Sequence, residues 1–228
     1  MDLEHFKIKE EEEIINAYSS GNDSINVDEQ TSSIYFCAGI NTNSISNLIN
    51  ELLKLEKKIL FKQKSLKRKI DKISKESKNS EDDEGYEDQF DIVLNVKPIK
   101  LYITSGGGLV YQVFSAIDTI KAMKVPVNTI CKGFVASAGT LLSLAGNRRF
   151  ITPNSYMLIH ELSTGHYGKF THLTESFENS KQLMEHIKSY YLEKTKMTSD
   201  ELDEQLKKDI CWNSNMCLEK GLVDEIMK

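Results

Sequence analysis

Short apolar segments alternate with amphipathic helical segments through the middle of the chain. Strands are predicted at about residues 99–103, 127–131 and 156–160, the last of them within an apolar stretch at 150–160 that is predicted as one strand. The spacing of apolar side chains between the strands predicts helices, the clearest at 109–124. The segment 99–103 alternates less than an exposed strand would, which favours a strand buried on both faces. Repeated strand–helix units of this kind restrict the chain to an α/β fold with a mostly parallel sheet.

The length and composition fit one well-cored domain, or one domain plus extensions. The chain has 228 residues, of which 39% are hydrophobic and 28% charged. The net charge of −5 gives no reason to expect a nucleic-acid partner. The four cysteines are scattered without a CxxC pair, and no histidine near them has metal-ligand spacing. Reduced thiols, no metal and no cofactor are therefore expected.

No targeting or membrane segment is predicted. No apolar run approaches the roughly 18 residues that span a bilayer. The start, Met-Asp-Leu-Glu-His, and the acidic run at 10–13 fit neither a secretory signal nor a transit peptide. A cytoplasmic location is therefore expected.

The folded domain is placed at residues 33–228. One charged segment precedes it, and a second interrupts it. Residues 1–32 are polar and acidic and are predicted to be a flexible arm, either a solvated tail or a docking or gating segment. Residues 33–39 are predicted to form the first strand, and Ser44 or Ser46 the N-cap of a helix.

A charged insertion, helical or disordered, is predicted at about 57–91. From Lys54 to Lys78 there are eleven Lys and Arg residues against three acids, and an acidic block follows at 81–91. The pattern of the basic part predicts a long amphipathic helix. Such a helix can bind nucleic acid or an anionic surface, but a solvated insertion is favoured because runs of charge are usually solvated. Phe61 is also the only aromatic residue among the basic ones that could stack on a base.

The stretch Gly133-Phe-Val-Ala-Ser-Ala-Gly139 lies between a predicted strand and a short helix at 140–146. A serine in such a tight turn exposes its hydroxyl beside free backbone N–H groups at a helix N-terminus. A serine nucleophile requires such a place, so Ser137 is the candidate nucleophile.

A serine nucleophile needs a base and an orienting carboxylate. His160 ends a predicted strand, at the sheet edge where reacting groups of α/β proteins collect, although a buried structural histidine is the alternative. Histidines 166, 172 and 186 fit less well, because they fall on a glycine loop and on polar helix positions. Asp209, between a helix and Ile-Cys-Trp, is the candidate acid, with a solvated charge as the alternative.

Backbone donors for an oxyanion are predicted at two turns. Ala138 follows the candidate nucleophile, and the glycine turn 106–108 ends the preceding strand. A triple glycine also resembles a phosphate-binding turn, but the GxGxxG spacing and the P-loop Lys-Ser/Thr are absent.

Four motifs in order carry a family resemblance: Leu-Tyr-Ile-Thr-Ser-Gly-Gly-Gly, Gly-Phe-Val-Ala-Ser-Ala-Gly, Pro-Asn-Ser-Tyr-Met-Leu-Ile-His and Glu-Lys-Gly-Leu-Val-Asp-Glu-Ile. Together, over about 33–56 and 92–228, the chain resembles the ClpP family, the proteolytic subunit of ATP-dependent Clp protease. The resemblance implies a crotonase-like α/β fold, a ββα spiral with a protruding handle helix. It also implies two stacked seven-membered rings fed by an AAA+ unfoldase ATPase. The handle falls on 163–196, where the sequence predicts a glycine-bearing loop or strand at 163–168 and one long helix at 170–196.

The resemblance also implies residue roles. Ser137, His160 and Asp209 fall on the family's catalytic triad, and Gly107 and Ala138 on its oxyanion donors. Five positions fall on its substrate-binding strands: Gly108, Leu109, Ser163, Thr164 and Gly165.

The resemblance has departures, which keep other functions open. Gly106 stands where the family has proline, and Glu161-Leu162 where it has Gln-Pro. The expected function is a compartmentalised serine endopeptidase that cleaves unfolded polypeptides. The alternatives are a non-catalytic ring subunit or scaffold, and a phage-type head-maturation protease.

Overall fold

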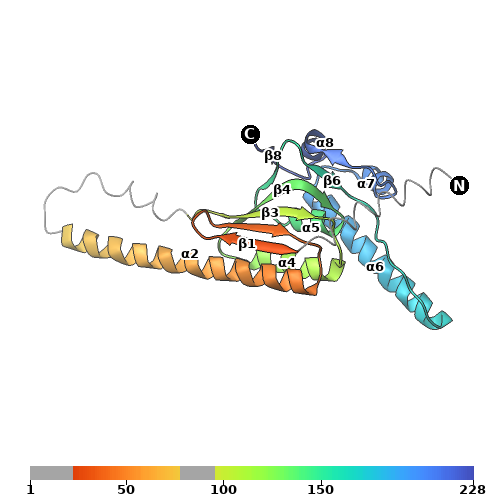
Figure 1. The fold of residues 1–228 in the computed structure, drawn as a ribbon, viewed down its shortest axis with the longest axis horizontal. Helices are drawn as coiled ribbons and strands as arrows, with labels where there is room; N and C mark the ends of the chain where they lie inside the picture. The colour runs from red at the N-terminus through yellow and green to blue at the C-terminus, as the bar shows by residue number, and fades with distance from the viewer. Residues whose placement is uncertain (1–22, 78–95) are drawn as a thin grey trace.

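The computed structural model describes residues 23–77 and 96–228 as one mixed α/β body (Figure 1). Its eight-stranded sheet runs in the order β1-β2-β3-β4-β5-β8, and β6 pairs with β4 and with β7. The strands are β1 Ser24–Asp28, β2 Ser33–Cys37, β3 Ile99–Ser105, β4 Val127–Ala136, β5 Arg149–Ile151, β6 Tyr156–Leu158, β7 Trp212–Asn213 and β8 Glu225–Ile226. Only the pairs β1–β2 and β6–β7 of this sheet are antiparallel, so the prediction of a mostly parallel sheet is confirmed.

The helices follow the apolar spacing of the sequence. They are α2 Thr42–Ser77, α4 Val110–Ala122, α5 Ala138–Ser143, α6 Phe170–Lys194, α7 Ser199–Leu206 and α8 Ser214–Glu219. Apolar side chains from α2 and α4 join those of the central strands in one core, where Leu48, Leu101 and Val113 have no exposed surface. This burial of apolar surface is the main stabilising contribution to the fold.

The expectation of a flexible arm over 1–32 is wrong for its last part. Ser24–Asp28 form β1, which pairs with β2 along its whole length. Ile25 and Val27 alternate with polar residues and are half-buried against the core. Residues 1–22 lie outside the described part of the chain.

The basic segment is a continuation of α2 rather than a separate element. The helix runs without interruption from the core to Ser77 and extends past the sheet (Figure 1). Phe61 is 72% exposed there, among lysines and arginines that face solvent. Residues 78–95, which hold the acidic block, lie outside the described residues. Within 23–77 and 96–228, none of the helices contains an apolar stretch that would span a bilayer.

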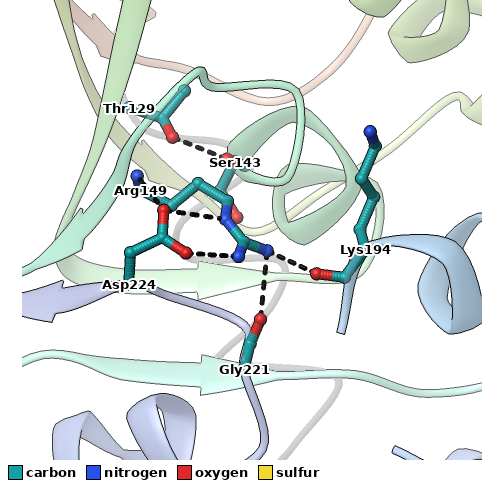
Figure 2. Close-up of polar contacts among 6 residues, drawn as sticks. All are labelled: Thr129, Ser143, Arg149, Lys194, Gly221 and Asp224. Carbon is teal, nitrogen blue, oxygen red and sulfur yellow. Dashed lines mark hydrogen bonds and ion pairs between the residues drawn. The ribbon is translucent and has the colours of Figure 1, made fainter. Parts of the chain in front are cut away.

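Arg149 joins three parts of the chain near the C-terminus (Figure 2). Its Nη1 donates to the Lys194 carbonyl at 2.6 Å and to the Gly221 carbonyl at 3.0 Å. Its Nε donates to Asp224 Oδ2 at 3.2 Å, and its Nη2 pairs with Oδ1 of the same carboxylate. The guanidinium therefore fixes the end of α6 and the C-terminal segment against β5.

Arg149→Met is expected to lower the free energy of unfolding by about 2–3 kcal/mol, because it removes charge-assisted hydrogen bonds and leaves the Asp224 carboxylate without its guanidinium counter-ion. The loss should be smaller than for a fully buried pair, because the Asp224 side chain is 37% exposed and solvent screens its charge. Urea unfolding measures the loss. Arg148→Met is the matched control: its pair with Glu225 is exposed, so about 1 kcal/mol or less should be lost.

The same pair should depend on pH. Partial burial raises the pKa of Asp224, but the hydrogen bonds and charge of Arg149 outweigh it and hold that pKa below the usual 3.8. The stabilisation is therefore complete above pH 3.8 and is lost as the pH falls through the lowered pKa. The difference between wild type and Arg149→Met should shrink in that range. An unchanged difference would mean that the ion pair does not cause it.

Candidate active site

Three adjacent parallel strands bring the candidate residues to one edge of the sheet. The central strand is β4, which pairs with β3 on one side and with β6 on the other. The glycine turn 106–108 follows β3, Ser137 follows β4, and His160 lies two residues after the end of β6. The Ser137 N–H donates to the Leu158 carbonyl at 2.9 Å, which fixes the serine beside the β6 end.

Ser137 has the strained backbone that a nucleophile turn requires. Its φ of 52° and ψ of −128° lie in a region that non-glycine residues rarely adopt. The sequence pattern predicts a turn within 133–139, but β4 continues to Ala136 and only Ser137 turns into α5. The strand bends at Gly133, whose φ is 73°, where its partner changes from β5 to β6.

The strained turn is supported from α6. Thr140 donates from its N–H at 2.9 Å and from its hydroxyl at 2.7 Å to the Ser137 carbonyl. Because the Thr140 hydrogen is used in that bond, the buried Tyr191 hydroxyl donates to Thr140 Oγ1. Burial raises the pKa of Tyr191, so the phenol stays neutral and keeps its hydrogen. The apolar spacing predicts Tyr191 on or near the inner helix face, but nothing in the sequence indicates this bond.

His160 and Asp209 lie next to each other. The distance from His160 Nδ1 to Asp209 Oδ1 is 3.4 Å, and the His160 side chain is only 19% exposed. Asp209 lies in the loop after α7, and the Glu161 N–H anchors that helix by donating to the Leu206 carbonyl at 2.9 Å. The carboxylate itself is 46% exposed. This arrangement can orient the imidazole so that Nε2 is left for a proton transfer.

One pocket holds five of the ten candidate residues. Its volume is about 260 Å³, and Ser137, Ala138 and His160 line it together with Gly108 and Ser163. The remaining wall is mainly apolar, with Leu141, Ile187 and Tyr191. Glu161 also lines it and is exposed to solvent.

A second pocket of about 390 Å³ adjoins the first. Leu109 and Thr164 line it, and Gly108 and Ser163 are shared by both pockets. Gly165 lines neither pocket, and a Cβ added to it would contact no atom within 4 Å. The segment 163–168, expected to be a loop or a strand, has no strand structure.

The glycine turn is held tightly against Ser137. The Ile40 N–H donates to the Gly107 carbonyl at 2.7 Å, and the Leu109 N–H donates to the Ile40 carbonyl at 2.8 Å. A Cβ on Gly107, whose φ is 96°, would lie 2.6 Å from Ser137 Cβ and 3.1 Å from the Ala138 nitrogen. The Gly107 N–H donates to Ser105 Oγ at 3.2 Å. An oxyanion would therefore have to share this N–H with Ser105 Oγ or displace that oxygen. The roles of Gly107 and Ala138 as donors stay a prediction.

The residue types at this sheet edge fit acyl transfer. A strained serine and a histidine line one pocket, and a carboxylate lies beside the histidine, which are the groups that this chemistry needs. Over 23–77 and 96–228, no group of three or more His, Cys, Asp and Glu side chains is placed to hold a metal ion.

A comparison with protein families supports this interpretation. The family model described as Clp protease matches residues 90–228, which is more than half of the chain and includes Ser137, His160 and Asp209. At the level of the family this indicates a serine peptidase. The chain therefore belongs to the Clp protease family.

Proposed function

We propose that the chain is a serine endopeptidase subunit that hydrolyses unfolded polypeptides with Ser137, His160 and Asp209. The observation that carries the proposal is the 3.4 Å approach of His160 Nδ1 to Asp209 Oδ1 beside the pocket that Ser137 lines. A histidine held in this way is the usual base for a serine nucleophile.

The proposed reaction has two steps. His160 Nε2 takes the Ser137 proton while Oγ attacks the scissile carbonyl, and the N–H groups of Gly107 and Ala138 stabilise the negative oxygen. His160 then gives the proton to the leaving amine, and the acyl-enzyme forms. Water, deprotonated by His160, hydrolyses the ester and returns the serine hydroxyl. Asp209 keeps the imidazole in the tautomer with hydrogen on Nδ1 and stabilises its charged form.

The proposal includes an assembly of several copies of the chain and an ATPase that delivers unfolded substrate to it. The family implies an oligomeric peptidase with an AAA+ partner, and we propose two stacked heptameric rings served by an unfoldase ATPase. Apolar side chains on the first turns of α6 support a contact between copies. Phe170 is 84% exposed, Phe177 is 65% exposed, and Leu173 lies between them at helical spacing.

A non-catalytic ring subunit is the second candidate. It is favoured by one observation, the hydrogen bond from the Gly107 N–H to Ser105 Oγ, which occupies a proposed oxyanion donor. Such a subunit would form rings with its relatives but would not hydrolyse peptides when purified alone or with an ATPase.

Asp209→Asn is expected to lower kcat for a fluorogenic peptide by about 10²–10⁴-fold, with KM little changed, because the amide cannot stabilise the imidazolium. Steady-state kinetics of the purified protein measure both constants. Asp203→Asn is the matched control, since that carboxylate pairs with Lys188 rather than with His160. Equal rates in Asp209→Asn and wild type would exclude the proposed acid.

A further inference from the structure

Beyond the core, α2 presents an exposed, positively charged surface, here named the basic face, over residues 57–72. This stretch contains eight Lys and Arg residues against one acid, and all eight are exposed: Lys57, Lys58, Lys62, Lys64, Lys67, Arg68, Lys69 and Lys72. Lys58 pairs with Glu29 in the turn between β1 and β2, at the end of the face nearer the core. Further out, like charges at helical spacing repel one another, so the face favours a negatively charged occupant.

A hollow of about 360 Å³ lies along the basic face. Phe61, which is 72% exposed, lines it together with cations and one serine from the next three turns of α2: Lys64, Ser65, Arg68, Lys69 and Lys72. An exposed aromatic ring among cations suits an occupant that carries aromatic side chains as well as negative charge.

The chain carries a segment of that composition directly after α2. Residues 78–95 lie outside the described residues, and their sequence contains seven acids against one lysine: Glu81, Asp82, Asp83, Glu84, Glu87, Asp88 and Asp91. Tyr86 and Phe90 are interspersed among these acids. The segment therefore matches the basic face both in the amount of charge and in its aromatic residues.

The described residues fix where this segment begins and where it must return. It begins at the far end of α2 and returns to Val96, which packs against the core three residues before β3. In β3, the Ile99 N–H donates to the Pro126 carbonyl at 2.8 Å. The neighbouring Val125 N–H donates to Glu56 Oε1 of α2 at 3.2 Å. The return point is therefore beside the core end of the basic face.

The lengths of the two segments also match. From Glu56 to the last residue of α2 the helix rises about 32 Å, at about 1.5 Å per residue. A chain as long as 78–95 reaches about 60 Å when it is fully extended, so it covers this distance with slack. A segment tethered at both ends of the face is present there at an effective concentration in the millimolar range.

We propose that the acidic segment 78–95 of the same chain occupies the basic face of α2 and screens it from other polyanions. Its carboxylates pair with the exposed cations, and its aromatic residues lie beside Phe61. Nucleic acid or an anionic membrane would have to displace this tethered counter-charge, and a second copy of the helix would bring like charges together. The inference does not depend on the proposed peptidase function.

Zero-length crosslinking of the purified full chain with a carbodiimide, mapped by mass spectrometry, tests the contact. Amide links are expected within one molecule between the acids at 81–91 and the lysines at 57–72. Their yield should fall several-fold in 1 M salt, where the Debye length is about 3 Å.

Lys97 and Lys100 are the internal control for proximity along the chain. Both are exposed, and both are closer in sequence to Asp88 and Asp91 than any lysine of the basic face is. A segment that does not dock would couple these two acids mainly to Lys97 and Lys100. That result would overturn the inference, as would yields that salt does not change, or links that form only between molecules.

Replacement of the seven acids by their amides, Glu→Gln and Asp→Asn, should uncover the basic face. The variant is expected to bind a fluorescein-labelled single-stranded oligonucleotide about 10-fold more tightly than wild type, because phosphates can then approach the cations. The same replacement of the six acids at 2–13 is the matched control, since it changes the net charge almost as much, and it should leave the affinity close to wild type. Equal affinities of wild type and the seven-acid variant, or an equal gain in the control, would overturn the screening.

Discussion

Ser137→Ala is expected to reduce kcat for peptide hydrolysis by about 10⁴-fold or more, because the proposed acyl-enzyme forms on its hydroxyl. Substrate binding should change little, since the pocket walls and the backbone amides remain. The alanine removes one oxygen from a position whose backbone is set by the bonds of Leu158 and Thr140, so the fold should be retained. Initial rates at saturating fluorogenic peptide, with protein concentrations high enough to detect slow turnover, measure the effect.

Ser115→Ala controls for the loss of any serine. Ser115 is exposed on α4 and lies outside both pockets, so its variant should keep the wild-type rate. If Ser137→Ala retained more than about a tenth of the activity, Ser137 would not be the nucleophile, because removing such a group costs orders of magnitude.

Gly107→Ala is expected to damage both stability and catalysis. The added Cβ would lie 2.6 Å from Ser137 Cβ and 2.9 Å from the Ala136 carbonyl oxygen, and the φ of 96° is unfavourable for alanine. Positive-φ strain costs about 1–3 kcal/mol, and the displaced turn moves a proposed oxyanion donor, which costs about 10²–10³-fold in kcat. Urea unfolding and steady-state kinetics measure the two effects separately.

Gly165→Ala is the control for this second substitution. A Cβ there meets nothing within 4 Å, so the free energy of unfolding should stay close to wild type. Wild-type kcat in Gly107→Ala would show that the glycine turn does not have to approach the nucleophile closely.

The parallel core of the fold can be predicted because local patterns and tertiary structure agree there. The apolar runs at 99–103 and 127–131 correspond to β3 and β4, and the helical spacing from 109 to 124 corresponds to α4. Burial along β3 alternates more than expected: Lys100 is exposed, while Ile99 and Leu101 are fully buried. Strand β1 could not be predicted in this way, because its position depends on pairing with β2. Ile25 and Val27 are its only apolar residues, and they lie in a polar stretch that gives no strong local signal for a strand.

The segment 150–160 shows where the local pattern is ambiguous. Its apolar residues predict one strand, but β5 and β6 are separated by a turn in which Ser155 donates its N–H to the Thr152 carbonyl at 3.0 Å. Both short strands pair with β4, on different parts of its length. The bend in β4 at Gly133 makes this possible, and it depends on sheet geometry that a linear pattern does not contain.

The site is predictable where residue type and position coincide. A serine, a histidine and a glycine turn each follow a strand, and parallel strands bring their ends together. Asp209 follows no strand, so its assignment beside His160 depends on the family resemblance. The supporting bonds of Ile40 and Tyr191 cannot be predicted in this way, because they join segments distant in sequence. The hydrogen bond from the Gly107 N–H to Ser105 Oγ cannot be predicted either, because the sequence does not indicate how a hydroxyl group is oriented.

The most direct test of the central claim is the covalent labelling of the purified full chain by a serine-reactive phosphonate, followed by peptide mapping. A single adduct on Ser137 is predicted, absent from Ser137→Ala and slower to form in Asp209→Asn. Equal labelling of wild type and Ser137→Ala, or an adduct on another residue, would contradict the assignment of Ser137 as the nucleophile.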